Sequence, residues 1–442
     1  MALAVLCATA VPARAARATG DLRLFVVLAG FPDRPLAHPR AYFTGGPTAL
    51  VDRLVAYWSE VSAGRLRIVP TVGEAVVTLP RARRLYVQRP AELASDALAA
   101  FSAAASGRDR DALAGADALV VFFAGPGRES HTQSGDPDDP WSNYTAVIPP
   151  PDDPPLREAC VIAEEEMAPF SSFGVLCHEF GHLLGLPELY APGGAAHEGV
   201  GVWDLMGQGT WLGRGDAPPG LSAWSKLRLG WVDVETVTTT TPALALPAVQ
   251  TTPRVVKIPA VPGVPEEYYL LENRARIGVD RSLPGEGLLV WHVDERVRGF
   301  RSGESDPAHK LLHLVEADGR GDLDRGHAAG GNRGDATDPW RGPPPWRRRA
   351  AAAATLAAAV LIAAAVLRAA RARAAVPVSL LLATAALLLG AAWPLRGAPV
   401  CGPGTPGMSP YEGGPVRVVL RNLSPAGPVM HVDVLVAPPG PD

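Results

Sequence analysis

The chain has 442 residues, of which 47% are hydrophobic and 19% are charged, and its formal net charge is −4 at pH 7. This length accommodates two or three domains, or one large enzyme domain with additions, and the composition is typical of a globular protein. A net charge so close to zero gives no reason to expect a nucleic-acid partner.

The N-terminal segment, residues 1–16, is apolar through Val11 and then reads Ala13-Arg14-Ala15, an A-x-A cleavage pattern. We therefore predict a secretory signal peptide over residues 1–19 and export to the extracellular space or the cell envelope. The basic n-region that usually opens such a peptide is missing. The alternative is an alanine-rich start without a targeting role.

Residues 20–231 have the pattern of an α/β (α+β) catalytic domain. Aliphatic runs indicate buried strands, and apolar residues at helical spacing indicate helices. The predicted elements are, in chain order, a buried strand at 22–28, helices at 50–61 and 91–105, a buried strand at 118–123, a polar loop at 129–155 and a helix at 173–186. Strands and helices that alternate in this way fit an α/β domain.

The second half of the chain has a different residue pattern, in which short β-branched runs alternate with Pro and Gly. Residues 232–345 predict a β-rich extension with a Gly/Asp-rich loop, and residues 397–442 predict strands that complete it. The predicted strand segments are 234–241, 254–258, 268–271 and 287–293, followed by two strands within 416–436.

Residues 346–396 interrupt this extension and predict a transmembrane helical hairpin. The stretches 350–367 and 374–395 contain 18 and 22 residues without a charge, which is about the length needed to cross a bilayer. Membrane anchoring through 350–395 is therefore expected. Two alternatives stay open, a buried pair of alanine-rich helices and an error in the reading frame of the gene.

Four cysteines are present, and no two of them form a C-x-x-C pair, which argues against a thiolate zinc site. They are Cys7, Cys160, Cys177 and Cys401. Cys160 and Cys177 would form a disulfide in an oxidising compartment or remain two buried thiols. Spacing alone leaves both alternatives open.

A candidate metal site lies on the predicted helix at 173–186. His178 and His182 are spaced i, i+4, so their imidazoles leave the same face of a helix and can bind one Zn²⁺. Glu179, beside the first ligand, can take a proton from a zinc-bound water as it attacks a peptide carbonyl. The sequence therefore predicts zinc-dependent peptide hydrolysis.

The residues after this motif predict the third ligand. Gly185 and Pro187 end the helix, because glycine permits a left-handed turn and proline cannot continue the hydrogen-bond ladder. A sharp turn there brings Glu188 back towards the metal, in the pattern H-E-x-x-H-x-x-G-x-x-E. The competing third ligands are Glu198 and Asp204, which would have to come from a following helix.

Met206 lies in the segment Trp203-Asp204-Leu205-Met206-Gly207. After a zinc helix, this context is typical of a Met-turn, which places a thioether beneath the metal. In isolation, a methionine near glycines would be ordinary core.

With these motifs in order along the chain, the sequence resembles the immune inhibitor A family of secreted bacterial zinc metallopeptidases. The segments that carry the resemblance are 25–33, 57–66, 174–190, 201–206, 221–231, 269–274, 283–294 and 316–319. The zinc helix and the Met-turn are the most specific of them, and their order strengthens the match.

The resemblance implies a metzincin-like catalytic domain with a β-rich extension. It also implies that His178, His182 and Glu188 bind zinc and that Glu179 is the catalytic base. The chain departs from the family pattern in having Glu188 and Ala191 where such proteins often have aspartate. The longer Glu188 side chain bears directly on ligand geometry.

Two weaker candidates lie in the extension. A flexible loop rich in carboxylates can bind Ca²⁺, although the spacing here is not that of an EF-hand, and a solvated acidic loop is the alternative. The carboxylates are Asp318, Asp322, Asp324, Asp335 and Asp338. His292, on a predicted strand, is expected to make a structural hydrogen bond rather than contact substrate.

The predicted function is that of a zinc endopeptidase acting on a protein or peptide substrate, with Ca²⁺ as a second candidate cofactor. The alternative is a non-catalytic surface adhesin or binding protein that keeps the peptidase fold. Loss of a ligand or of Glu179 would indicate that alternative, but all of these residues are present.

Overall fold

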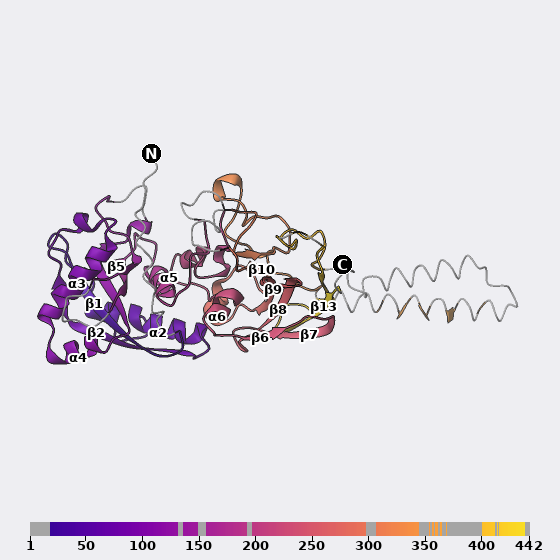
Figure 1. Ribbon diagram of the computed structural model, residues 1–442, viewed down its shortest axis with the longest axis horizontal. Helices are drawn as coiled ribbons and strands as arrows, with labels where there is room; N and C mark the ends of the chain where they lie inside the picture. The colour runs from indigo at the N-terminus through magenta and orange to yellow at the C-terminus, as the bar shows by residue number, and fades with distance from the viewer. Residues whose placement is uncertain are drawn as a thin grey trace. The chain divides into compact units, whose positions relative to one another are not determined.

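The computed structural model describes residues 18–130, 136–148, 156–191, 197–297, 306–343, 400–411, 413 and 415–437, and single helical positions between 353 and 368. The chain divides into two compact units (Figure 1). Unit 1 comprises Met1–Glu188 and Val202–Trp231, and unit 2 comprises Leu189–Gly201 and Val232–Asp442.

Unit 1 is built on a five-stranded sheet in the order β2-β1-β3-β5-β4. Four strands are parallel, and β4 at the edge runs antiparallel to β5. The strands are β1 (Gly20–Gly30), β2 (Leu66–Thr78), β3 (Ala118–Pro126), β4 (Asn143–Ala146) and β5 (Glu158–Glu165). The central strands β1 and β3 are buried along nearly their whole length, as expected for parallel strands covered on both faces.

Helices pack against this sheet (Figure 1). The helices of unit 1 are α1 (Arg40–Phe43), α2 (Leu50–Val61), α3 (Pro90–Ala104), α4 (Gly107–Ala114), α5 (Phe173–Leu183) and α6 (Ala223–Arg228). Of these, α2, α3, α4 and α5 contact strands of the sheet. On one face, Phe101 of α3 makes an edge-on contact with Phe25 of β1 at a ring-centroid distance of 5.1 Å. Burying a phenylalanine of this kind contributes about 1.5–3 kcal/mol. Trp58 of α2 packs against Phe180 of α5 at 5.8 Å, so aromatic packing fixes the helix that carries the metal motif.

Three strands of this sheet differ from the sequence predictions. Strand β4 lies inside the segment that we predicted to be a loop. No strand was predicted there because β4 is a short, polar edge strand without an apolar period. Strand β2 was not predicted, since Pro70 and Gly73 within it are typical of strand ends and bulges. Strand β5 also lacks a predicted counterpart, although it is almost fully buried.

Unit 2 contains a five-stranded sheet, β11-β10-β9-β8-β6, and a three-stranded sheet, β12-β13-β7. One hydrophobic core includes buried side chains from strands of both sheets. The strands are β6 (Asp233–Thr236), β7 (Thr241–Pro247), β8 (Arg254–Val261), β9 (Val264–Arg274), β10 (Gly287–Asp294), β11 (Leu312–Leu314), β12 (Val418–Arg421) and β13 (Val429–Val436). Strand β13 pairs antiparallel with both β12 and β7, so strands near the C-terminus share a sheet with β7.

The segment Leu189–Gly201 belongs to unit 2, whereas the sequence placed it in the catalytic domain. Hydrogen bonds explain this difference. The amide of Glu198 donates to the carbonyl of Leu323 (3.1 Å). The fully buried Lys310 donates from Nζ to the carbonyls of Gly199 and Leu323, both at 3.3 Å. Tertiary contacts of this kind leave no local sequence signal.

The two alternatives for Cys160 and Cys177 are resolved in favour of thiols. Both residues are free and buried, as is Cys401, in agreement with the alternative of two buried thiols. Burial raises the pKa of Cys160 and of Cys177 well above the usual range of a thiol. Neither residue is therefore a reactive thiolate at neutral pH.

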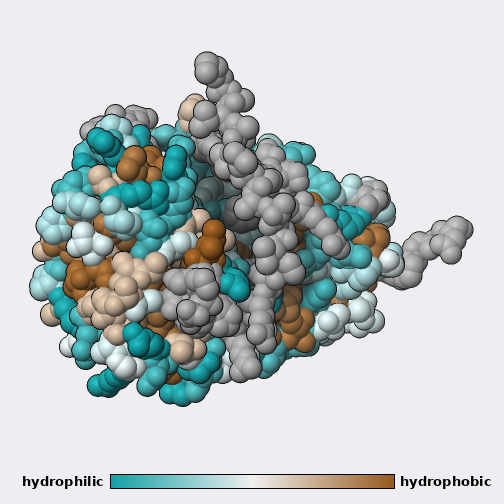
Figure 2. All heavy atoms as spheres, turned by 60° about the vertical axis from the view of Figure 1, so that its left-hand side comes forward, coloured by the Kyte–Doolittle hydropathy of each residue, from teal (hydrophilic) through white to brown (hydrophobic). Residues whose placement is uncertain are grey.

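No helix among the described residues has the length and apolarity needed to cross a membrane. The predicted hairpin at 346–396 and the predicted signal peptide at 1–19 lie almost entirely outside those residues, and the structure gives the membrane anchor no support. On the face shown in Figure 2, apolar side chains form small patches among polar ones, which is ordinary for a globular surface.

Candidate metal centre

Helix α5 presents the metal motif because its remaining residues are almost all buried. Phe173, Leu176 and Phe180 are among its core side chains. At its C-terminus, the amide of Leu186 donates to the carbonyl of Gly181 (3.1 Å) and that of Gly185 to His182 (2.9 Å). These two bonds form a Schellman motif.

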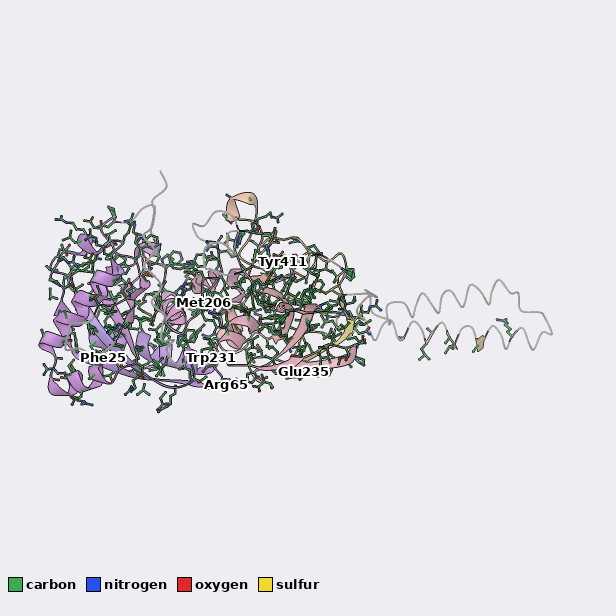
Figure 3. All side chains as sticks on the ribbon, in the orientation of Figure 1. Phe25, Arg65, Met206, Trp231, Glu235 and Tyr411 are labelled. Atoms are coloured by element: carbon green, nitrogen blue, oxygen red, sulfur yellow. The ribbon has the colours of Figure 1, made fainter. Side chains whose placement is uncertain are left out.

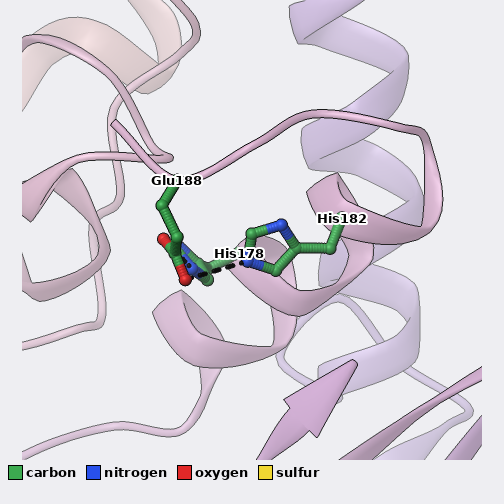
Figure 4. A group of neighbouring side chains, drawn as sticks. All are labelled: His178, His182 and Glu188. Carbon is green, nitrogen blue, oxygen red and sulfur yellow. Dashed lines mark hydrogen bonds and ion pairs between the residues drawn. The ribbon is translucent and has the colours of Figure 1, made fainter. Parts of the chain in front are cut away.

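Gly185 adopts the left-handed conformation that this motif requires, with φ of +96°. The predicted sharp turn after the helix is therefore present, and it reverses the chain. Glu188 follows three residues later and faces the helix again (Figure 4).

The three predicted ligands converge at this turn. Glu188 Oε2 lies 3.1 Å from His178 Nε2, and Glu188 Oε1 lies 3.2 Å from His182 Nε2 (Figure 4). One ligand atom from each residue lies within 4.8 Å of the other two. His178 is buried, and His182 and Glu188 are partly buried.

Hydrogen bonds on the far side of each imidazole fix its orientation. His182 Nδ1 donates to the carbonyl of Leu186 (2.8 Å). His178 Nδ1 lies 2.9 Å from Thr210 Oγ1, which itself donates to the carbonyl of Leu205. With Nδ1 bonded in this way, Nε2 of both rings is left as the metal-facing nitrogen, an arrangement usual for histidine ligands.

The charges of His178, His182 and Glu188 stabilise one another. Burial by itself lowers the pKa of His178, but the Glu188 carboxylate outweighs it and raises this pKa to about 9. Burial acts on Glu188 in the opposite sense, and the two histidines hold its pKa well below the usual range. Without a cation the site therefore retains a proton on His178, and a divalent metal would displace that proton on binding.

Zinc fits the residues present. Glu188 Oε2 is buried and lies 3.1 Å from His178 Nε2, so the carboxylate and the two imidazoles already face one another. Two imidazole nitrogens and one carboxylate oxygen form the donor set of many catalytic zinc sites, which leave a further position open. In such a site a cation would replace the His178 proton that balances the charge of Glu188.

The two competing third ligands have other roles. Asp204 is fully buried, and its carboxylate accepts from the Met206 amide (2.7 Å), the Ser222 amide (2.8 Å) and the Ser225 hydroxyl (2.7 Å). Glu198 lies in unit 2, with its carboxylate 3.6 Å from Arg333 Nε. Among the described residues, Glu188 is the carboxylate that the structure groups with the two histidines.

Met206 packs directly beneath helix α5 (Figure 3). A Cβ added to Gly181 would lie 2.5 Å from Met206 Sδ, so only glycine fits at this position of the helix. The thioether is fully buried. The turn at 204–206 thus has the place expected of a Met-turn, with Asp204 holding its backbone.

Glu179 is held by the edge strand. Its Oε2 accepts from the backbone amide of Tyr144 in β4 at 2.6 Å. Sequence analysis missed Tyr144, which lay in a predicted loop, and also Thr210. Both act on the motif from 32 or more positions away in the chain, and a distance of that kind leaves no spacing signal.

The weaker candidates lie in unit 2. His292 is fully buried, with Nε2 2.9 Å from Glu267 Oε1 and Nδ1 2.9 Å from the carbonyl of Gly407, so it makes structural hydrogen bonds. The acidic loop brings together two overlapping groups of carboxylates, Glu316 with Asp318 and Asp338, and Asp318 with Asp322 and Asp335. Asp324 instead pairs with Lys310 at 2.6 Å.

Residues 158–232 match the family model described as the immune inhibitor A peptidase M6 catalytic domain. The resemblance to the immune inhibitor A family is confirmed over this stretch. The match contains helix α5, Glu188 and Met206, and therefore supports a peptidase of the metallopeptidase type.

A relative named immune inhibitor A, from Bacillus thuringiensis subsp. alesti, is 33% identical over 122 residues. This alignment covers 25% of the present chain and 18% of the relative. The chain thus matches less than a fifth of the relative's length, and the shared region is confined to a part of each protein.

Proposed function

We propose that this chain is a zinc-dependent endopeptidase that hydrolyses peptide bonds of extracellular or cell-envelope proteins. The observation that supports it best is the convergence of His178, His182 and Glu188 at the end of helix α5, within the stretch that matches a peptidase catalytic domain. The substrate class follows from the peptidase match, and the cellular location from the predicted signal peptide.

His178, His182 and Glu188 would hold the zinc. When bound, zinc supplies Lewis acidity and lowers the pKa of water. The backbone amide of Tyr144 donates a hydrogen bond to Glu179 Oε2. This leaves Oε1 as the oxygen that takes a proton from the attacking water. The same oxygen can then pass the proton to the leaving amine. The edge strand keeps this carboxylate in place throughout.

The test combines metal analysis with a peptidase assay. Purified protein should contain about one equivalent of zinc, and cleavage of casein or a quenched fluorescent peptide should stop with 1,10-phenanthroline and return with added zinc. Glu179→Gln should keep the zinc but lower turnover by roughly 10²–10⁴-fold, since the proton acceptor is gone.

Glu60→Gln is the matched control, because Glu60 is an exposed glutamate on helix α2. This variant should cleave like the wild type. Near-normal turnover in Glu179→Gln would contradict the mechanism. Zinc-loaded protein without any peptidase activity would instead favour the adhesin or binding-protein alternative.

A further inference from the structure

Two glutamates, Glu166 buried and Glu129 partly buried, lie side by side just beyond the C-terminal ends of β5 and β3, and the catalytic proposal does not use them. Pro126, the last residue of β3, is paired with Glu165, and the Gly127 amide donates to the Glu165 carbonyl at 3.0 Å. Glu129 and Glu166 follow directly on these two adjoining segments. The pairing of the strands thus brings together residues that are 37 positions apart.

Their carboxylates face each other across Gly127. A Cβ added to Gly127 would lie within 2.6 Å of both Glu129 Oε1 and Glu166 Oε1. These two oxygens are therefore no more than twice that distance apart. Glycine at position 127 leaves the space between them open.

Three of the four carboxylate oxygens are buried without a hydrogen-bond partner among the described residues. They are Glu129 Oε1, Glu166 Oε1 and Glu166 Oε2. The fourth, Glu129 Oε2, accepts from the Ser142 amide at 3.2 Å. Glu166 is only 6% exposed, so water does not compensate it, and a buried carboxylate without a partner is costly.

No described arginine or lysine forms an ion pair with either glutamate, so the described part of the chain supplies no compensating positive charge. Burial raises the pKa of both groups, and the proximity of Glu129 contributes to raising that of Glu166 to about 10. Either a proton or a bound cation must neutralise the pair at neutral pH.

The number of carboxylate oxygens that need a partner distinguishes a shared proton from a bound cation. A single proton shared between Glu129 Oε1 and one oxygen of Glu166 gives partners to two of the three orphaned atoms and leaves the third unsatisfied. A cation bound by Glu129 Oε1 and by both oxygens of Glu166 satisfies all three. Monodentate and bidentate carboxylates are the usual ligands of Ca²⁺.

We propose that Glu129 and Glu166 form a divalent-cation site of the calcium type, separate from the zinc centre. The site has a consequence for the catalytic base. Glu129 Oε2 holds the Ser142 amide, and Ser142 directly precedes β4, whose Tyr144 amide binds Glu179. A bound cation would therefore stabilise the start of the strand that positions Glu179.

The experiment uses full-length, zinc-loaded protein freed of calcium on a chelating resin and then titrated with Ca²⁺. All variants carry Asp318→Asn and Asp335→Asn, so that the acidic loop of unit 2 does not contribute. Calorimetry should show one Ca²⁺ bound per chain, and the melting temperature should rise by roughly 5–10 °C at 100-fold excess over Kd. The rise in melting temperature reports binding independently of peptidase activity.

Glu166→Gln should abolish both the calorimetric signal and the rise in melting temperature. Glu165→Gln, the neighbouring and partly exposed glutamate, should retain them. Equal Ca²⁺ titrations in the two variants would overturn the proposal. Should Glu166→Gln fail to fold, the stoichiometry of the parent protein decides, because absence of bound Ca²⁺ there also overturns it.

A shared proton gives a different result. A carboxyl whose pKa is raised by folding contributes stability at low pH and loses it as the pH rises from 4.5 towards about 10. A melting temperature that falls over this range in the parent but not in Glu166→Gln, together with no response to Ca²⁺, would establish the proton and reject the cation.

Discussion

The end of helix α5 and the acidic loop of unit 2 both gather potential metal ligands, but their ligand atoms differ in what they already contact. In the helix site, the potential ligand atoms face one another: Nε2 of His178 and Nε2 of His182 lie 3.1 and 3.2 Å from the Glu188 carboxylate, and a hydrogen bond at Nδ1 orients each ring. In the acidic loop, protein donors occupy the carboxylates. Asp322 accepts from Asn332 Nδ2 at 3.0 Å and pairs with Arg325.

Three further loop carboxylates are occupied in the same way. Asp335 accepts from Asn332 Nδ2 at 3.1 Å, Asp318 from the Thr337 hydroxyl at 2.6 Å, and Glu316 from two backbone amides at 2.8 Å. Proximity of potential ligand atoms is common to both regions. A strong cation site additionally needs oxygens and nitrogens that the protein has not already satisfied.

Removal of the third ligand tests the helix side of this comparison most directly. Glu188→Ala should lower zinc affinity by more than about 100-fold, since it removes a direct ligand and not merely an outer contact. Glu198→Ala, the control, should leave the affinity unchanged. Competition with a chromophoric chelator measures both, and a reversed order would show that Glu198 is the ligand.

The protonation of His178 gives the next largest effect. Its pKa of about 9 in the metal-free site means that zinc must displace a proton below that pH. Zinc affinity should therefore increase roughly tenfold for each pH unit between 6 and 8. Chelator competition at several pH values provides the measurement, and an affinity independent of pH would refute the proposed charge balance.

Packing beneath the helix can be tested without touching a ligand. Gly181→Ala places a Cβ against Met206 Sδ and should destabilise the protein by about 1–3 kcal/mol through overpacking. The double variant Gly181→Ala, Met206→Ala should recover part of this loss if that contact is the cause. Denaturant unfolding reports both values, and additive losses would exclude the contact.

The acidic loop should give the smallest effect. In the Glu166→Gln protein, Ca²⁺ should raise the melting temperature by less than the rise seen at the Glu129–Glu166 pair, because protein donors must be displaced first. Asp318→Asn with Asp335→Asn should remove what remains. A larger response from the loop would show that satisfied carboxylates still make a strong site.

The grouping of the candidate metal ligands was predictable because it is local. His178, Glu179 and His182 follow helical spacing, and Gly185 forms the left-handed turn that returns Glu188 to the helix. Helices α2 and α3 were predictable for the same reason, since their apolar periods match the structure. In each case the residues that determine the local structure lie within about four positions of the residues whose structure they determine.

What the sequence did not reveal depends on pairing between distant segments. Tyr144 reaches Glu179 only because β4 adds to the edge of the sheet. Glu129 and Glu166 meet only because β3 and β5 are neighbours. Strand neighbours are set by the packing of the whole sheet, which a single sequence does not specify.

The membership of Leu189–Gly201 in unit 2 has a consequence for how this chain can be divided. The chain passes between the units after Glu188, after Gly201 and after Trp231. A gene shortened at codon 231 would encode the whole metal motif but not Lys310, whose ammonium group binds the carbonyl of Gly199. The loop that leaves the third ligand would then lose its support. Recombination after Trp231 would therefore separate Gly199 from Lys310. The parts of the chain on either side of this border must then be exchanged together.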